Sequence, residues 1–276
     1  MTARPTPTVA LTIAGTDSGG GAGIAADLRT FAAHGLFGTL AVTAVTAQNT
    51  LGVQSVSVLD ASMVAAQIDS VVADLAPAAA KSGMLATPST VKMLAAKAAA
   101  GELPPLVVDP VLVASSGDPL FEGTGTAEAY RELASVAAVI TPNLPEASLL
   151  VGRELPDLAA MEEAARELHG LGAGLAVVKG GHREDAEAVD VAYDGASITY
   201  LRAPWVRTRN VHGTGCSFSA AICANLALGH APLAAALRAK AYVHRAIELA
   251  ADWRLGGGHG PIDHLGAARE PGGEVV

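Results

Sequence analysis

Residues 9–34 read VALTIAGTDSGGGAGIAADLRTFAAH, which is an apolar run, a glycine-rich turn and an amphipathic run in direct succession. The apolar run Val9–Ile13 predicts a buried strand, and the glycines of Gly15–Gly23 predict a flexible turn. The run Ile24–His34 predicts a helix because its apolar residues recur at helical spacing, at Ile24, Leu28 and Phe31. We therefore expect a strand–loop–helix unit at the start of the fold.

The same unit recurs along the rest of the chain. Apolar runs predict strands at 40–46, 79–84, 106–109, 138–141 and 175–179, and amphipathic runs predict helices at 62–75, 90–100, 125–134, 157–168, 215–228 and 233–252. Strands that alternate with helices are typical of a mostly parallel sheet covered on both faces. Residues 188–201, around the turn dipeptide Asp194-Gly195, instead predict a small β-hairpin at one sheet edge. We expect a single α/β domain over residues 9–265, with flexible ends at 1–8 and 266–276.

The overall composition excludes several classes of protein. The chain has 276 residues, a formal net charge of −9 and no run of Lys or Arg, so we expect no nucleic-acid or membrane partner. Glycine, proline or a charge interrupts every apolar stretch before it reaches the roughly 20 residues of a membrane span. The two cysteines, Cys216 and Cys223, are too few for a disulfide scaffold and fit no zinc-finger spacing. We therefore expect a soluble protein of the reducing cytoplasm.

The glycine-rich turn also fits a dinucleotide-binding fingerprint, because GAGIAA at residues 21–26 matches GxGxxA between a strand and a helix. Such a site needs an acidic residue about 20 positions later to hold a ribose. The second predicted strand ends in Thr46-Ala47-Gln48 instead. No GxxxxGK[ST] motif occurs either. A dinucleotide cofactor is therefore disfavoured, and a P-loop is excluded.

A second glycine cluster, Gly213-Thr214-Gly215, precedes a predicted helix. Free N–H groups and the partial positive charge of a helix N-terminus would stabilise the negative charge of a transferring phosphoryl group. An ordinary glycine-rich start of a helix would look the same. Cys216 lies in the first turn, where the same dipole favours a thiolate that could accept a proton. Cys223, two turns further along, is expected to be an inert core residue.

Polar side chains follow several of the predicted strands, at the edge of the sheet where ligands bind in such folds. The carboxylates of Asp109 and Glu146 suit Mg²⁺, bound directly or through water, and Lys179 would supply a charge for phosphate. The alternatives are that Asn143 or Glu146 merely caps the next helix and that Lys179 is a solvated residue. Gln48 could bind an amino group beside a ring nitrogen through its amide, or be a turn residue satisfied locally.

Taken in order, these clusters resemble the ribokinase-like superfamily, and specifically the hydroxymethylpyrimidine and phosphomethylpyrimidine kinases of thiamine biosynthesis. The resemblance covers about residues 9–265, and its motifs are LTIAGTD (11–17), TAQNT (46–50), KSGM (81–84), DPV (109–111), SGD (116–118), TPNLPEA (141–147), KGGH (179–182), HGTGC (212–216) and GHGP (258–261). It implies a ribokinase-like fold and a homodimer. It also implies ATP- and Mg²⁺-dependent phosphorylation of an aminopyrimidine alcohol and then of its monophosphate.

The resemblance also implies roles for individual residues. The phosphoryl-transfer residues would be Gly213, Thr214, Gly215 and Cys216, with Cys216 as base where the wider superfamily usually carries Asp. The pyrimidine would lie among Gly15, Asp17, Ala22, Gln48, Met84 and Val111. Nucleotide and phosphate groups would be bound by Asn143, Lys179 and His212, and Mg²⁺ by Asp109 and Glu146.

Two comparisons within the family refine this hypothesis. Ser18 stands where the family usually has Pro, which leaves φ less restricted, so we expect a less rigid loop. Pyridoxal kinases are the main alternative, but that branch carries a second Cys in the flap after Asp-Pro-Val, and residues 112–116 (LVASS) contain none. A catalytically silent binding protein of this fold would be expected to lose part of the phosphate-binding set. None of that set is missing, so we expect an active pyrimidine kinase.

Overall fold

The computed structural model describes residues 6–113, 120–121, 124–181 and 187–268. Residues 116–118 and His182, which belong to two of the sequence motifs, lie outside these ranges, as do residues 114–115. Of the expected C-terminal tail, residues 266–268 are described and form the short helix η1 (Gly266–Ala268). Within the described ranges, no helix has both the length and the hydrophobicity needed to span a membrane.

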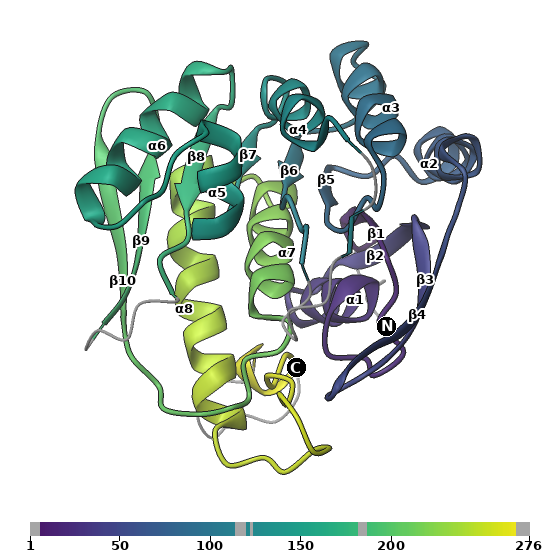
Figure 1. Cartoon of the computed structure of the whole chain (residues 1–276). Helices are drawn as coiled ribbons and strands as arrows, with labels where there is room; N and C mark the ends of the chain where they lie inside the picture. The colour runs from purple at the N-terminus through teal and green to yellow at the C-terminus, as the bar shows by residue number, and fades with distance from the viewer. Residues whose placement is uncertain (1–5, 114–119, 122–123, 182–186, 269–276) are drawn as a thin grey trace.

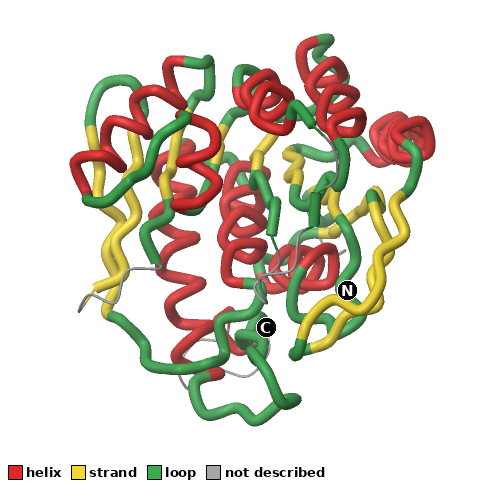
Figure 2. Tube along the Cα trace, in the orientation of Figure 1, coloured by secondary structure: helices red, strands yellow, loops and turns green. Residues whose placement is uncertain are grey.

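An eight-stranded sheet forms the centre of the molecule, with strand order β10-β9-β8-β7-β6-β5-β1-β2 (Figures 1 and 2). Six of its strands, β1, β2, β5, β6, β7 and β8, run parallel to one another, whereas β9 is antiparallel to β8 and pairs with β10 as an edge hairpin. The bounds are β1 (Val9–Ala14), β2 (Phe37–Val42), β5 (Ala79–Ser82), β6 (Leu106–Val108), β7 (Val139–Ile140), β8 (Leu175–Val178), β9 (Glu187–Tyr193) and β10 (Ile198–Pro204). The expected α/β fold and its edge hairpin are confirmed.

Helices cover both faces of this sheet (Figure 1). One face packs against α1 (Gly23–Ala33), α7 (Thr214–Ala227) and α8 (Pro232–Ala250). The other packs against α2 (Ala61–Leu75), α3 (Pro88–Ala99), α4 (Thr126–Ala134), α5 (Leu144–Val151) and α6 (Leu158–Gly170). The parallel strands β1, β6, β7 and β8 are buried on both sides, and their sequences are near-continuous apolar runs.

Alternate residues of each strand enter the two different cores. In β5, Ala79 belongs to the core beneath α1, α7 and α8, and Ala80 belongs to the core beneath α2 to α6. Val107 and Val108 of β6 divide in the same way. Side chains point to opposite faces with a period of two, so the residue two places after Ala79 or Val107 again faces α1 and α7. This parity decides where the polar residues at the strand ends lie.

The single strand expected over residues 40–46 is wrong. The chain leaves the central sheet at Thr43, between β2 and β3 (Ala44–Asn49), and β3 forms a separate two-stranded sheet with β4 (Gly52–Val58), which was not predicted. Thr43 fixes the break, because its N–H donates to the carbonyl of Ala14 and its hydroxyl to the carbonyl of Met84, 2.6 Å away. Val45 and Val56 of the β3–β4 sheet are exposed, so the apolar pattern gave no signal for it.

Candidate active site

The start of α7 is built from backbone that only glycine can supply. Gly213 has φ +83°, and a Cβ on it would collide with the carbonyl oxygen of Gly21. The loop before α7 therefore packs directly on the loop between β1 and α1. A Cβ on Gly215 would lie 3.3 Å from Lys179 Nζ and 4.0 Å from Asp109 Oδ2. The expected proximity of the glycine cluster to these two charged residues is thus found in the structure.

Asp109 is the centre of the charge cluster beside α7. It follows β6, is 1% exposed, and accepts a hydrogen bond from Lys179 Nζ at 2.8 Å. Ser219 of α7 donates to its other oxygen at 3.0 Å, and the Thr141 hydroxyl lies 3.3 Å from Oδ1. Burial alone would raise the pKa of Asp109, but the cations of Lys179 and Lys81 hold it below its usual value. Asp109 is therefore an ionised carboxylate.

Asn143 and Glu146 together cap α5, a helix that was not predicted. The Asn143 side chain accepts from the Glu146 N–H at 2.9 Å, and Glu146 Oε2 accepts from the Asn143 N–H at 2.8 Å. The capping alternative is therefore realised, because this reciprocal pair is a capping box. Burial, reinforced by the charge of Asp109 and opposed by Lys179, raises the pKa of Glu146 to about 7. Glu146 thus faces the charge cluster as well as the helix backbone.

Asp17 and His212 join the two glycine-rich loops. One Asp17 oxygen accepts from the N–H groups of Gly21 and Ala22 and lies 2.8 Å from His212 Nε2, while the other accepts from the Gly19 N–H. Burial opposes ionisation, yet the hydrogen bonds from His212 and Ala22 hold the pKa of Asp17 below its usual value. Both side chains are buried and paired with each other, so the geometry favours loop positioning for them over direct ligand contact.

An apolar surface lies beside these loops. A Cβ on Gly15 would lie 2.8 Å from the sulfur of Met84, and Met84 packs with Ala44 and Ala86 in a small cluster joined by Val111. Ala22 is the N-cap residue of α1, at the end of the loop that follows β1. Of the residues expected to line the ring pocket, Gly15, Met84 and Val111 therefore lie together beyond the carboxyl ends of β1, β5 and β6.

Gln48 lies on β3, where a register shift follows Ala47. The Ser18 hydroxyl accepts from the Gln48 N–H and donates to the Gln48 carbonyl, both at 2.8 Å. The Ser18 hydroxyl thus ties the loop to β3, a contact that proline could not make and that opposes the looser loop expected from the sequence. The Gln48 side chain is half-buried, with Oε1 lying 3.4 Å from the Thr46 hydroxyl.

Cys216 lies in the first turn of α7 and is half-buried. The expectation that its thiolate is favoured is wrong for the free protein, because burial of the thiol raises its pKa to about 11. The Lys81 cation and a hydrogen bond from the Gly23 N–H oppose this rise. Cys223 is fully buried among core residues, as expected.

The sequence reasoning missed a buried ion pair next to this site. Lys81 Nζ lies 3.0 and 2.9 Å from the two oxygens of Asp27, and the Thr12 hydroxyl donates to Asp27 at 2.6 Å. The available signal was a lysine inside the apolar run AAAKSGM, where a buried strand was expected. Ser219 and Thr141, the partners of Asp109, were also missed because they carry no motif of their own.

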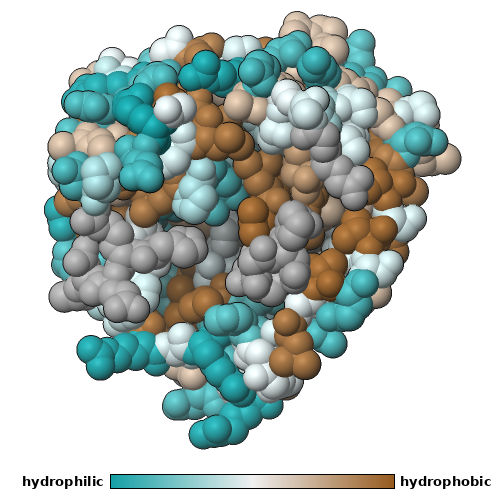
Figure 3. All heavy atoms as spheres, viewed as in Figure 1, coloured by the Kyte–Doolittle hydropathy of each residue, from teal (hydrophilic) through white to brown (hydrophobic). Residues whose placement is uncertain are grey.

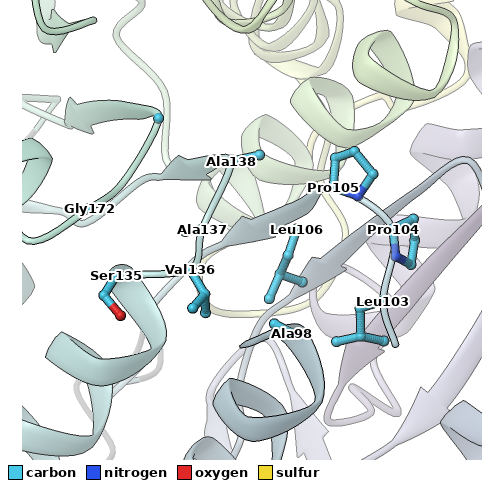
Figure 4. Close-up of a pocket in the computed structure, with 11 residues that line it drawn as sticks. Ala98, Leu103, Pro104, Pro105, Leu106, Ser135, Val136, Ala137, Ala138 and Gly172 are labelled. Atoms are coloured by element: carbon cyan, nitrogen blue, oxygen red, sulfur yellow. The ribbon is translucent and has the colours of Figure 1, made fainter. Parts of the chain in front are cut away.

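A pocket of about 400 Å³ lies near the amino ends of β6, β7 and β8, at the opposite ends of the strands from Asp109 and Lys179 (Figure 4). It is lined by small and apolar side chains around Leu103 and Leu106, and the hydroxyl of Ser135, its one polar side-chain group, is bonded to the Glu132 carbonyl. Within the described ranges, no group of three or more His, Cys, Asp or Glu side chains that could hold a metal ion is found. The chemistry is therefore concentrated at the carboxyl ends of the strands.

Residues 17–263 match the family model described as phosphomethylpyrimidine kinase. The chain belongs to this family. A relative from Rhizobium meliloti (strain 1021), named hydroxymethylpyrimidine/phosphomethylpyrimidine kinase, is 46% identical over 264 residues, covering 93% of this chain and 97% of its own.

Solved structures of two family branches are also similar. The phosphomethylpyrimidine kinase from Clostridium difficile 630 has a TM-score of 0.76 and 36% identity, covering 87% of this chain and 99% of its own. The pyridoxal kinase from Staphylococcus aureus, solved with AMP-PCP and pyridoxal, has a TM-score of 0.85 and 33% identity, covering 95% of this chain and 94% of its own. The ribokinase-like architecture of this family member is thereby confirmed.

Proposed function

We propose that this family member is an ATP-dependent kinase that phosphorylates 4-amino-5-hydroxymethyl-2-methylpyrimidine and then its monophosphate, to give the pyrophosphate used for thiamine biosynthesis. The observation that carries the proposal is the convergence of Cys216, Lys179 and the Gly15–Met84 surface at one sheet edge. The names of the pyrimidine kinase relatives support the substrate. A kinase neighbour solved with AMP-PCP supports the use of ATP.

The aminopyrimidine is proposed to lie on the surface formed by Gly15, Ala22, Met84 and Val111. Because Gly15 has no Cβ, the Met84 sulfur packs directly against its backbone, and together they offer an apolar surface for a flat ring. Gln48 offers an amide that can pair with an amino group and its neighbouring ring nitrogen. Asp17 is proposed to act through the loop backbone that it holds.

The transferred phosphoryl group is proposed to bind at the start of α7, against the N–H groups of Gly213–Gly215 and the Lys179 ammonium. His212 would position this loop through Asp17, and Asn143 would hold the start of α5 beside the phosphates. The substrate hydroxyl oxygen bonds to the γ-phosphorus, the bond to the bridging oxygen of ADP breaks, and the hydroxyl proton passes to the thiolate form of Cys216. Preorganised N–H groups stabilise the charge that develops on the phosphoryl oxygens.

Asp109 and Glu146 fit Mg²⁺ bound through water. Burial, and to a smaller extent the charge of Asp109, raise the pKa of Glu146, and a cation held between the two carboxylates would relieve their repulsion. Two carboxylates and substrate phosphates are a common donor set for this ion. When bound, Mg²⁺ would neutralise phosphate charge, while Lys179 and Ser219 keep Asp109 oriented.

A coupled assay of ADP release tests the substrate assignment. The pyrimidine alcohol and its monophosphate should both support turnover, with a higher kcat/KM than pyridoxal. Pyridoxal is the informative competitor because pyridoxal kinases are close structural neighbours. Absence of ADP release with either pyrimidine, or a preference for pyridoxal, would overturn the proposal.

Replacing the proposed base provides the mechanistic test. Cys216→Ala should lower kcat by about 10²- to 10⁴-fold, the usual contribution of a general base, with nearly unchanged ATP affinity. Cys223→Ala is the matched control, because that thiol is buried in the core and should affect only stability. Undiminished turnover of Cys216→Ala would reduce Cys216 to a residue of the helix N-terminus.

We also propose a homodimer and a cytoplasmic setting. Val45, Leu51 and Val56 are exposed on and beside the β3–β4 sheet, and Figure 3 shows hydrophobic side chains gathered on that side of the molecule. Light scattering after gel filtration measures the assembly, and a monomer at micromolar concentration would contradict it. A thiol base must stay reduced, which supports the reducing compartment.

A further inference from the structure

Lys81 is a fully buried lysine, with both its side chain and that of Asp27 at 0% exposure. Lysine is almost never fully buried without a partner, and desolvating an ion pair is costly. A pair of apolar residues is often at least as stable in such a position. Stability of the fold therefore gives no sufficient reason for charges here.

The position of the Lys81–Asp27 pair relative to Cys216 offers a reason for these buried charges. A Cβ on Gly213 would lie 3.3 Å from the Cα of Ala22, so the start of α7, which carries Cys216, packs against the start of α1. Asp27 lies one helical turn after Gly23, the first residue of α1. One turn of an α-helix is about 5.4 Å long. Asp27 binds the Lys81 ammonium with both oxygens, so α1 sets the spacing between the ammonium and the sulfur.

The strand parity brings Lys81 to the same side of the sheet. Lys81 is two residues after Ala79, which packs against the α1 and α7 core, so its side chain points towards these helices. A Cβ on Gly83 would lie 2.8 Å from Lys81 Nζ, and this glycine thus leaves room for the ammonium. The amine is enclosed between β5, α1 and the start of α7.

We propose that Lys81, held in place by Asp27, is a positioning residue whose buried ammonium stabilises the thiolate of Cys216. The inference rests on the proposed function, in which Cys216 accepts the proton of the substrate hydroxyl. Other charges that face the thiol are Asp27 on α1, Asp109 after β6 and Lys179 after β8. Of these charges, Lys81 has the largest effect on the pKa of Cys216, and it lowers that pKa. Lys81 keeps its own charge because Asp27 raises its pKa against the effect of burial.

Alkylation of Cys216 by iodoacetamide, a neutral reagent, measures its thiolate directly and needs no substrate. We would compare rates between pH 7 and pH 9 in a Cys223→Ala background, with and without Lys81→Met. Loss of a nearby cation raises a thiol pKa by about one unit or more. After allowing for the greater nucleophilicity of a more basic thiolate, each unit slows alkylation by about threefold to tenfold. We therefore expect at least a threefold slower reaction in the variant.

Thr12→Val is the matched control for general damage to the cluster. It removes the hydroxyl that bonds Asp27 but changes no charge. Its alkylation rate should stay within about twofold of the background protein, because each tenfold change requires a whole pKa unit. If Thr12→Val slows alkylation as much as Lys81→Met does, the effect is structural and the proposal fails.

Lys81→Met leaves Asp27 buried without a partner, so the double variant Lys81→Met/Asp27→Asn provides a second, charge-free test. Its alkylation should be slower than in the background protein but faster than in Lys81→Met, because the opposing charge of Asp27 is lost with the cation and Lys81 has the larger effect of the two. An unchanged rate in Lys81→Met, or, where only the double variant folds as judged by circular dichroism, a rate no slower than that of the background protein, would overturn the proposal.

ADP release and thiol alkylation distinguish a failure of the proposed function from a failure of the role proposed for Lys81. Wild-type protein that alkylates as expected but releases no ADP with the pyrimidines contradicts the substrate, whereas an insensitive thiol in an active kinase contradicts only the role of Lys81. In an active enzyme, Lys81→Met should also lower kcat at neutral pH by threefold or more, with KM for ATP unchanged. The pH dependence of kcat should shift upward by at least one unit.

Discussion

Two lysine–aspartate pairs lie on the α7 side of the sheet and differ in their access to solvent. Lys81 is 2.9 Å from Asp27 with neither side chain exposed, whereas Lys179 is 2.8 Å from Asp109 and its own side chain is 15% exposed. The open pair can share its ammonium with an arriving phosphate, but the sealed pair cannot change partners. The two distances are similar, so under the proposals above it is access to solvent that distinguishes the pair that binds phosphate from the pair that sets the potential at Cys216.

The sealed pair should have the larger effect on stability. Lys81→Met leaves a buried carboxylate without its cation, and breaking such pairs costs about 3–5 kcal/mol. Urea denaturation measures the loss. The double variant Lys81→Met/Asp27→Asn should recover most of it, because neither charge is then left unpaired. A cost below about 1 kcal/mol for the single variant would place this pair among ordinary surface salt bridges.

The open pair should have the larger effect on catalysis. Lys179→Ala should lower kcat/KM by about 10²- to 10³-fold, as loss of one preorganised charge-stabilising group does elsewhere. Lys97→Ala provides the control, since Lys97 also bonds a carboxylate, Asp69, but lies on α3 away from the site. If both variants retain full activity, the comparison between open and sealed pairs fails.

The pH dependence of stability at Glu146 tests whether the cluster of Asp109, Glu146 and Lys179 carries more negative than positive charge. Its pKa is raised from 4.5 to about 7, mainly by burial. Its contribution to stability is therefore fully present below pH 4.5 and is lost as the pH rises through 7. The loss amounts to about 3 kcal/mol.

Glu146→Gln should remove this pH dependence, because glutamine preserves the capping box without a charge to titrate. The free energy of unfolding, measured with urea at pH 5 and pH 8, should differ less in the variant than in the wild type. Equal pH dependence in both proteins would show that the carboxylate is not held near neutral pH.

Ser18 holds the backbone of Gln48 on β3, so replacing it tests whether the position of Gln48 matters for binding of the pyrimidine. Ser18→Ala removes two hydrogen bonds to the Gln48 backbone, each worth about 1 kcal/mol. KM for the pyrimidine should rise by about 5- to 30-fold, because losing about 1–2 kcal/mol corresponds to roughly that factor. KM for ATP should stay constant, and an equal rise for both substrates would argue against a specific effect on Gln48.

Several features of the fold were predictable because they depend on local pattern. The apolar runs and the turn at Asp194-Gly195 led directly to the parallel strands and the edge hairpin. The β3–β4 sheet was not predictable, because Val45 and Val56 are apolar residues that face solvent. The α5 helix was also missed, since its eight residues depend on the Asn143–Glu146 cap more than on periodicity.

The candidate site was predictable wherever a motif carried it. Gly213–Cys216 and Lys179 were identified because glycine and charge stand out at strand and helix ends. The environment of the Cys216 thiol was not predictable from the sequence. A helix N-terminus favours the thiolate while burial opposes it, and only the packing reveals that burial has the larger effect. The Lys81–Asp27 contact joins residues 54 positions apart, a distance over which no local pattern operates.

The sequence by itself determined the α/β fold, the family and the residue types available for phosphoryl transfer, because these follow from periodicity and from ordered motifs. Only the tertiary structure decided which charges meet and which are sealed. Solvent access and pKa depend on the atoms that surround a group, and those atoms come from strands and helices far apart in the chain. Lys81 and Lys179 are therefore the same residue type in the sequence, and only the folded protein gives them different burial and different partners.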